Sequence, residues 1–121
     1  MKYLLLLYQD ARILEGRSPE ESARIFDEYM DYTSRIHRNG NYVAGEALAP
    51  ISTARTVRQR NGKMLTTDGP FAETKEQLGG FYLVEANDVD EAIALAERIP
   101  AARNGTIEVR PLVPRMVEAP A

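Results

Sequence analysis

Side chains able to do chemistry are concentrated in one run of the chain, residues 66–81, with the sequence TTDGPFAETKEQLGGF. Its aspartate, Asp68, is a candidate general base or ligand for a polar group, because a positioned carboxylate can take a proton from a substrate. Aspartate before Gly-Pro is also typical of a turn capped by its own side chain. In that structural interpretation, which we favour, an ion pair with Arg55 keeps Asp68 ionised.

The charged residues that follow form a second candidate group. Glu73, Lys75 and Glu76 would place a carboxylate and an ammonium beside one cleft if the loop folds over a sheet, and would then position a small polar substrate. The alternative is a solvated loop, which is the usual role of such a charge run. Glu46 comes directly after an apolar stretch and faces either the same cleft as Asp68 or solvent.

The histidine and the tyrosines complete the candidates. His37 has an ordinary pKa near neutrality and suits acid–base chemistry, but beside Arg35 and Arg38 at a helix end it also suits the helix dipole. Tyrosines combine an apolar ring with one polar tip, so one or two of them, Tyr8 among the candidates, are expected to line a pocket. With no cysteine and one histidine, the sequence predicts no metal site and no thiol chemistry.

Composition limits the function classes further. The chain has 121 residues, which predicts one domain, and its net charge of −3 gives no reason to expect nucleic-acid binding. The opening run MKYLLLLYQD is too short to cross a bilayer and lacks a signal-peptide cleavage site. We therefore expect a cytoplasmic protein that does not contact membranes.

A long helix is predicted to begin at Ser18, because Ser-Pro-Glu-Glu supplies an N-cap, a proline at the first helical position and a capping acid at Glu21. Gly40 is the expected C-terminal glycine. The helical spacing predicts one buried stripe made of Ile25, Phe26, Tyr29, Tyr32, Thr33 and Ile36. The segment before this helix, residues 9–17, is predicted to be a loop.

A β-hairpin is predicted around Asn61-Gly62, the strongest two-residue turn signal. Its strands would span residues 54–60 and 63–67, and a two-residue loop pairs positions whose numbers sum to 123. Arg55 then lies opposite Asp68, and Val57 opposite Thr66. Because the hairpin is polar on much of both faces, we expect it to project from the domain or to lie at an edge.

The remaining elements predict the architecture. Strands are expected at residues 3–8, 41–48, 81–86 and 106–110, and Gly79-Gly80 favours a bulge before the third of these. A second helix is expected to start after Asp88 and to end at Pro100, with a buried face made of Val89, Ala92, Ile93, Ala96 and Ile99. The domain is predicted to cover residues 1–112, followed by an extended tail at residues 113–121.

Without the hairpin, the order is β-α-β twice, which is typical of a ferredoxin-like α+β fold: an antiparallel sheet with two helices on one face. The other face would then expose Tyr3, Leu5, Leu7, Phe81 and Leu83, or their neighbours one residue on. A small domain should not leave such an apolar face in water. We therefore expect a homodimer whose sheets pair face to face, with a cavity between or beside them.

Four segments of the chain closely resemble the DGPF-type proteins of the YCII-related family. They are YLLLLY at the start, VAGEAL, TDGPFAETKEQLGGFYLVEA and RIPAARNGTIEVRPL. The resemblance extends from Met1 to about Leu112, and the third segment is the most specific. It implies a ferredoxin-like chain that dimerises into an α+β barrel.

The resemblance also implies two functions. Related proteins carry a histidine and an aspartate in a cleft; the aspartate falls on Asp68, and near the histidine this chain has Tyr29. One hypothesis is therefore a cofactor-free enzyme that uses Asp68, with Glu46 or Tyr29, for acid–base chemistry on a small organic molecule. Similar domains also occur beside extracytoplasmic-function sigma factors. The alternative is therefore a non-enzymatic ligand-binding or regulatory domain with a sigma factor as its partner.

Overall fold

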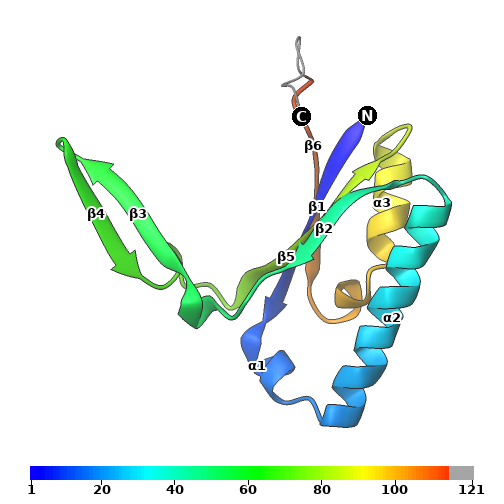
Figure 1. Ribbon diagram of the computed structural model, residues 1–121, viewed down its shortest axis with the longest axis horizontal. Coiled ribbons are helices and arrows are strands. Elements are labelled where there is room, and N and C mark those ends of the chain that lie inside the picture. The colour runs from blue at the N-terminus through cyan, green and yellow to red at the C-terminus, as the bar shows by residue number, and fades with distance from the viewer. Residues whose placement is uncertain (115–121) are drawn as a thin grey trace.

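A computed structural model describes residues 1–114, so the predicted tail falls almost wholly outside the described part. Six strands and two α-helices form in the order predicted, and a third, short α-helix, α1, is added to them (Figure 1). Their bounds are β1 Lys2–Asp10, α1 Ala11–Glu15, α2 Pro19–Arg38, β2 Tyr42–Ala47, β3 Arg55–Arg60, β4 Lys63–Asp68, β5 Glu76–Glu85, α3 Val89–Glu97 and β6 Thr106–Pro111. Two short 3₁₀ turns lie at Ile51–Thr53 and Pro100–Arg103.

The main sheet has the strand order β2-β5-β1-β6, and every neighbouring pair is antiparallel. The long helices α2 and α3 lie together on one side of this sheet (Figure 1). This arrangement confirms the predicted α+β, ferredoxin-like class with two helices on one face. The inserted hairpin forms a separate two-stranded sheet of β3 and β4.

The core lies between the sheet and the helices. Alternate residues of β1, Tyr3, Leu5 and Leu7, are buried there, as the period of two in a strand requires. Helices and β5 contribute Tyr32, Ile36, Ala92, Ala96, Tyr82 and Val84. For β1, two sets of residues were predicted as alternatives for the face away from the helices. The structure has the second set, so Leu4 and Leu6 lie on that open face.

The open face of the sheet holds a half-buried apolar cluster. Leu4 lies opposite Leu83, and Leu6 opposite Phe81, in the β1–β5 pair. No helix of the described residues covers this face (Figure 1). We call Leu4, Leu6, Phe81 and Leu83 the open-face cluster.

Both ends of α2 follow the local sequence signals. The Ser18 hydroxyl accepts a hydrogen bond from the Glu21 backbone amide at 3.1 Å. At the other end Gly40 has φ of +79°, and its amide and that of Asn41 donate to the carbonyls of His37 and Ile36. A residue in the left-handed region after a helix is usually glycine because a Cβ is disfavoured there.

Three residues predicted to be buried are exposed, and the reason is their position around the helix. Phe26 is 62% exposed, because it lies roughly 90° around the axis from the stripe of Tyr29, Tyr32 and Ile36. Ile93 directly follows the buried Ala92 and so points about 100° away from it. Val89, in the first turn of α3, is also exposed.

The segment predicted to be a loop at residues 9–17 is also different. It completes β1 and forms α1, which is capped by Asp10: its carboxylate accepts from the Arg12 amide at 2.9 Å. The local sequence signal for this helix is Asp10 itself, because aspartate is a favoured N-cap residue. The short helix turns the chain from the end of β1 toward α2 (Figure 1).

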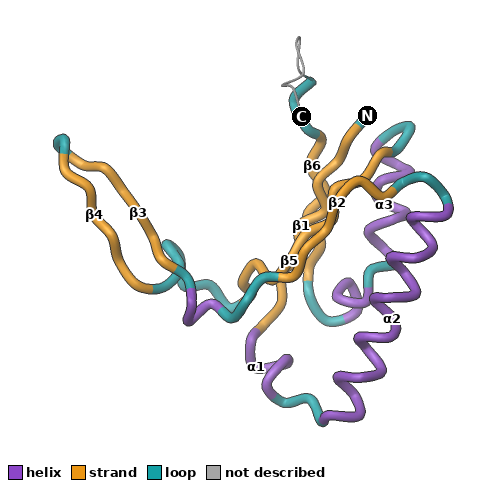
Figure 2. The backbone as a smooth tube through the Cα atoms, viewed as in Figure 1, coloured by secondary structure: helices purple, strands orange, loops and turns teal. Residues whose placement is uncertain are grey.

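The hairpin has the predicted register. Arg55 pairs with Asp68 and Val57 with Thr66, and the turn residues Asn61 and Gly62 have φ of +52° and +75°. The hairpin extends away from the main sheet on the side opposite the helices (Figure 2). The predicted bulge is also present, because pairing along β1 passes from Gly80 to Leu78 and leaves Gly79 as the extra residue.

Candidate functional site

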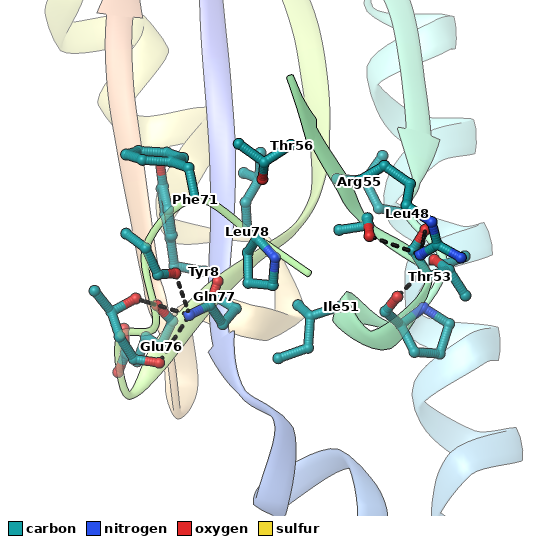
Figure 3. A pocket seen from close by; sticks show the side chains of 16 residues that line it. Tyr8, Leu48, Ile51, Thr53, Arg55, Thr56, Phe71, Glu76, Gln77 and Leu78 are labelled. Carbon is teal, nitrogen blue, oxygen red and sulfur yellow. Dashed lines mark hydrogen bonds between the residues drawn. The ribbon is translucent and has the colours of Figure 1, made fainter. Parts of the chain in front are cut away.

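A cleft of about 600 Å³ lies between the root of the hairpin and the end of the main sheet (Figure 3). One wall comes from the end of β1 and the start of β5, with Tyr8 and residues 76–78. The other comes from the two chain segments at the root of the hairpin: residues 48–56 except Ser52, and Pro70, Phe71, Ala72 and Thr74. These pieces are distant in the sequence, and only folding brings them to one place.

The lining is mainly apolar, with a few polar groups. Its apolar side chains include Leu48, Ile51, Pro70, Phe71 and Leu78. Among the lining residues, the ionisable ones are Tyr8, Arg55 and Glu76. An apolar cleft with a small number of placed polar groups is the usual form of a small-molecule site.

Hydrogen bonds hold the wall beside β5 in place. The Gln77 amide donates to the carbonyls of Ala72 and Thr74, at 3.1 and 2.9 Å, and so fixes the loop before β5. A carboxylate oxygen of Glu76 accepts from the Thr106 hydroxyl at 2.7 Å. Sequence reasoning assigned Glu76 to an irregular loop, whereas the structure places it in β5.

Arg55 and Asp68 close the hairpin at its root. Their ion pair measures 3.2 Å, and the Arg55 guanidinium also donates to the Ala54 carbonyl at 2.9 Å. The Asp68 side chain is 90% exposed, so no burial acts on its carboxylate. Arg55 lines the cleft, whereas Asp68 contacts it through Arg55.

The three residues predicted for acid–base chemistry lie in three different places within one chain. Asp68 ends β4 of the hairpin. Glu46 is exposed on β2, opposite Phe81, at the edge of the open sheet face. Tyr29 packs against the core from α2, on the other side of the sheet, where burial raises the pKa of its phenol.

Of the four predicted ligand contacts, Tyr8 lines the cleft. Glu73 and Lys75 are exposed in the loop that precedes β5, and neither belongs to the lining. His37 stacks on Tyr42, with ring centroids 3.9 Å apart, near the C-terminal end of α2. Its role there is to pack against β2 at the end of the helix.

Sequence reasoning missed Asp10, the buried carboxylate at the end of β1, which is 7% exposed. The Arg12 guanidinium holds it with two hydrogen bonds, of 3.2 and 2.8 Å, and the pKa of Asp10 falls from 3.8 to about 2. In the β1–β5 register Asp10 lies opposite Glu76, a residue of the cleft. The Arg12 guanidinium therefore neutralises the Asp10 carboxylate, one strand position across from the cleft residue Glu76.

The lowered pKa of Asp10 predicts a pH-dependent stability. A group with a lower pKa in the folded state stabilises the fold above its unfolded pKa, here 3.8, and this contribution is lost as the pH falls toward 2. Arg12→Gln should therefore lower the free energy of unfolding at pH 6 and reduce its change between pH 4 and 2. Urea unfolding at several pH values measures both, with the exposed Arg24→Gln as control. Equal pH slopes for Arg12→Gln and the wild type would contradict the assignment.

Within residues 1–114, no helix combines the length and the apolar character needed to span a bilayer.

Comparison with known proteins gives the family. The sequence model of the YCII-related domain matches residues 1–115. The chain is also 37% identical, over 114 residues, to an uncharacterised protein of Rhizobium meliloti (strain 1021), and the match covers 93% of this chain and 92% of that protein. A match of this extent means that the chain belongs to the YCII-related family.

Proposed function

We propose that this protein binds a small organic molecule in the cleft at the root of the hairpin. The observation that carries the proposal is a cleft of about 600 Å³ whose lining is mostly apolar and includes Tyr8, Arg55 and Glu76. This volume lies within the range of about 300–1,000 Å³ that is common for small-molecule sites. For the enzymatic hypothesis, we propose that the chemistry takes place in this cleft and not at Asp68 itself.

The polar groups suit a molecule with an apolar body and polar ends. Tyr8 and Glu76 lie on one side of the cleft, and Arg55 lies on the opposite side (Figure 3). Arg55 would take an anionic or carbonyl oxygen, since a guanidinium only donates hydrogen bonds. Glu76 is the carboxylate of the lining and therefore its candidate proton acceptor. Asp68 would act as a positioning residue, because its ion pair orients Arg55.

We propose also that the working form is a homodimer paired through the open-face cluster. Four large apolar side chains lie half-buried on a sheet face that no helix of residues 1–114 covers, and a contiguous apolar patch often marks a protein–protein interface. Tyr8 and Leu78 lie on the same face, in the β1–β5 register, and line the cleft. A second copy on this face would thus also cover one side of the cleft and exclude water from it.

A ligand-binding experiment tests the proposal. Fragments consisting of small aromatic and branched aliphatic carboxylic acids, amides and alcohols are titrated into ¹⁵N-labelled protein. We expect at least one to bind with a dissociation constant below about 1 mM, or about −4 kcal/mol, and to shift the amide signals of residues 48–56 and 70–78. Ala49→Trp, which places an indole in the cleft, should weaken that binding at least tenfold, whereas Ala23→Trp on the exposed side of α2 should not.

Two outcomes would contradict the proposal. The first is a set of bound fragments whose affinities are the same in Ala49→Trp and in the wild type. The second is signal changes that lie only on α2 and α3. If no fragment binds while a sigma factor is retained on the immobilised protein and released by competition with the isolated hairpin peptide, the regulatory alternative is favoured instead.

A further inference from the structure

The hairpin of residues 55–68, which we call the arm, lacks packing partners within the described chain. Its strands β3 and β4 pair with each other and with no other strand. Every residue of β4 is exposed, and of β3 only Thr56 is half-buried. An isolated two-stranded hairpin is marginally stable in water, so an arm of this kind needs a surface to pack on.

Apolar side chains are exposed on both faces of the arm. Val57 and Met64 lie diagonally across the two strands on one face, and they are 61% and 69% exposed. Leu65 lies on the other face and is 49% exposed. Val57 and Met64 form one apolar patch, and an exposed apolar patch on a projecting hairpin suits contact with another molecule.

The charge of the arm indicates which molecule that is. The arm carries four cations and one carboxylate, a net charge of +3, whereas the whole chain has a net charge of −3, which leaves −6 on the remainder. Arg58, Arg60 and Lys63 share the face that also carries Leu65, and none of the three takes part in an ion pair within residues 1–114. A basic arm beside an acidic body is complementary to a second copy of the same chain.

The direction of the arm supports the same partner. The arm and the helices lie on opposite sides of the main sheet, so the arm stands on the side of the open-face cluster (Figures 1 and 2). A second copy that covers this cluster would be placed within reach of the arm. Two-fold symmetry would then put each arm against the body of the other copy.

We infer that the arm packs on the body of the partner copy, so that the dimer is formed by exchange of arms as well as by contact of sheets. The inference rests on the proposed dimer and adds a second contact to it. It also affects the cleft, because Arg55, Thr56 and Pro70 at the root of the arm line that cleft. Once the partner fixes the arm, the wall of the ligand site becomes fixed as well.

Cross-linking of a single introduced cysteine tests the exchange, because the natural chain contains no cysteine. The ¹⁴N variant Met64→Cys, changed near the arm tip, is labelled with a benzophenone maleimide. It is then mixed with ¹⁵N wild-type protein, which carries no benzophenone, under conditions that allow subunit exchange, and the mixture is irradiated. From a 1:1 mixture we expect about half of the cross-linked peptides to join a ¹⁴N arm to a ¹⁵N body, because random pairing gives half of the benzophenone-bearing arms a ¹⁵N partner. Glu20→Cys, at the start of α2 and away from the arm, should give few such pairs.

Charge reversal provides a second measurement. Arg58→Glu with Arg60→Glu should raise the dimer dissociation constant at least tenfold at 0.05 M salt, and much less at 1 M, where the Debye length falls to about 3 Å. A dimer with cross-links only within one chain would overturn the arm exchange and leave the dimer standing. A wild-type monomer at 10 μM would overturn both. An unchanged dimer constant combined with lost binding to heparin would assign the arm to a polyanion instead.

Discussion

Leu6→Asp should abolish the proposed dimer and leave a folded monomer. In the register of the sheet, Leu6 lies between Phe81 and Glu108, and Phe81 lies beside Glu46. The new carboxylate would thus sit in one row with two existing ones, at the centre of the open-face cluster. An uncompensated charge buried at an interface costs about 3–5 kcal/mol, which raises the dissociation constant by roughly 100- to 4,000-fold.

The monomer itself should tolerate this change, because Leu6 lies on the face opposite the helix-covered core. Sedimentation velocity between 1 and 100 μM measures the dimer constant, and circular dichroism checks that the fold remains. Leu6→Val is the matched control and should stay dimeric, since it keeps an apolar, strand-favouring side chain at the same place. A Leu6→Asp protein that dimerises as tightly as Leu6→Val would show that this face is not the interface.

Local signals predicted those parts of the fold that depend on local contacts. Asn61-Gly62 fixed the turn, the strand register and the Arg55–Asp68 pair, because a two-residue turn determines which residues lie opposite. Ser18 and Gly40 marked the two ends of α2 for the same reason. Phe26 and Ile93 were wrongly predicted to be buried. Helical spacing shows which residues share one stripe, but it does not show how far around the helix the packing against the sheet extends.

The candidate site was less predictable, because its walls come from three separate parts of the chain. Tyr8, residues 48–56 and residues 70–78 carry no shared pattern in the sequence, and only the pairing of β1 with β5 and the closure of the hairpin bring them together. The DGPF turn led to Asp68, which lies beside the cleft, while the lining residues Arg55 and Glu76 contact its interior. Sequence patterns thus located the neighbourhood of the site and two of its ionisable lining residues, Tyr8 and Glu76, whereas Arg55 was expected only as the partner of Asp68.

Gly105→Ala should destabilise the fold by about 2–3 kcal/mol, as expected for severe overpacking. A Cβ at this position would overlap the Tyr8 carbonyl oxygen and would lie 3.0 Å from that of Ala101. Both are backbone atoms, so the end of β1 or the turn at Pro100–Arg103 has to move. For a domain of this size the melting temperature should fall by roughly 10 °C, which calorimetry measures.

The same substitution also tests the shape of the cleft. Gly105 lies against the backbone of Tyr8, and Tyr8 lines the cleft. Displacing the Tyr8 backbone should weaken fragment binding at temperatures where the variant is still folded. Gly79→Ala is the matched control: an added Cβ there has no atom within 4 Å, so its stability should stay within about 0.5 kcal/mol of the wild type. If Gly105→Ala has the same melting temperature as Gly79→Ala, the close contact between Gly105 and β1 is wrong. The placement of Tyr8 in the wall of the cleft is then wrong as well.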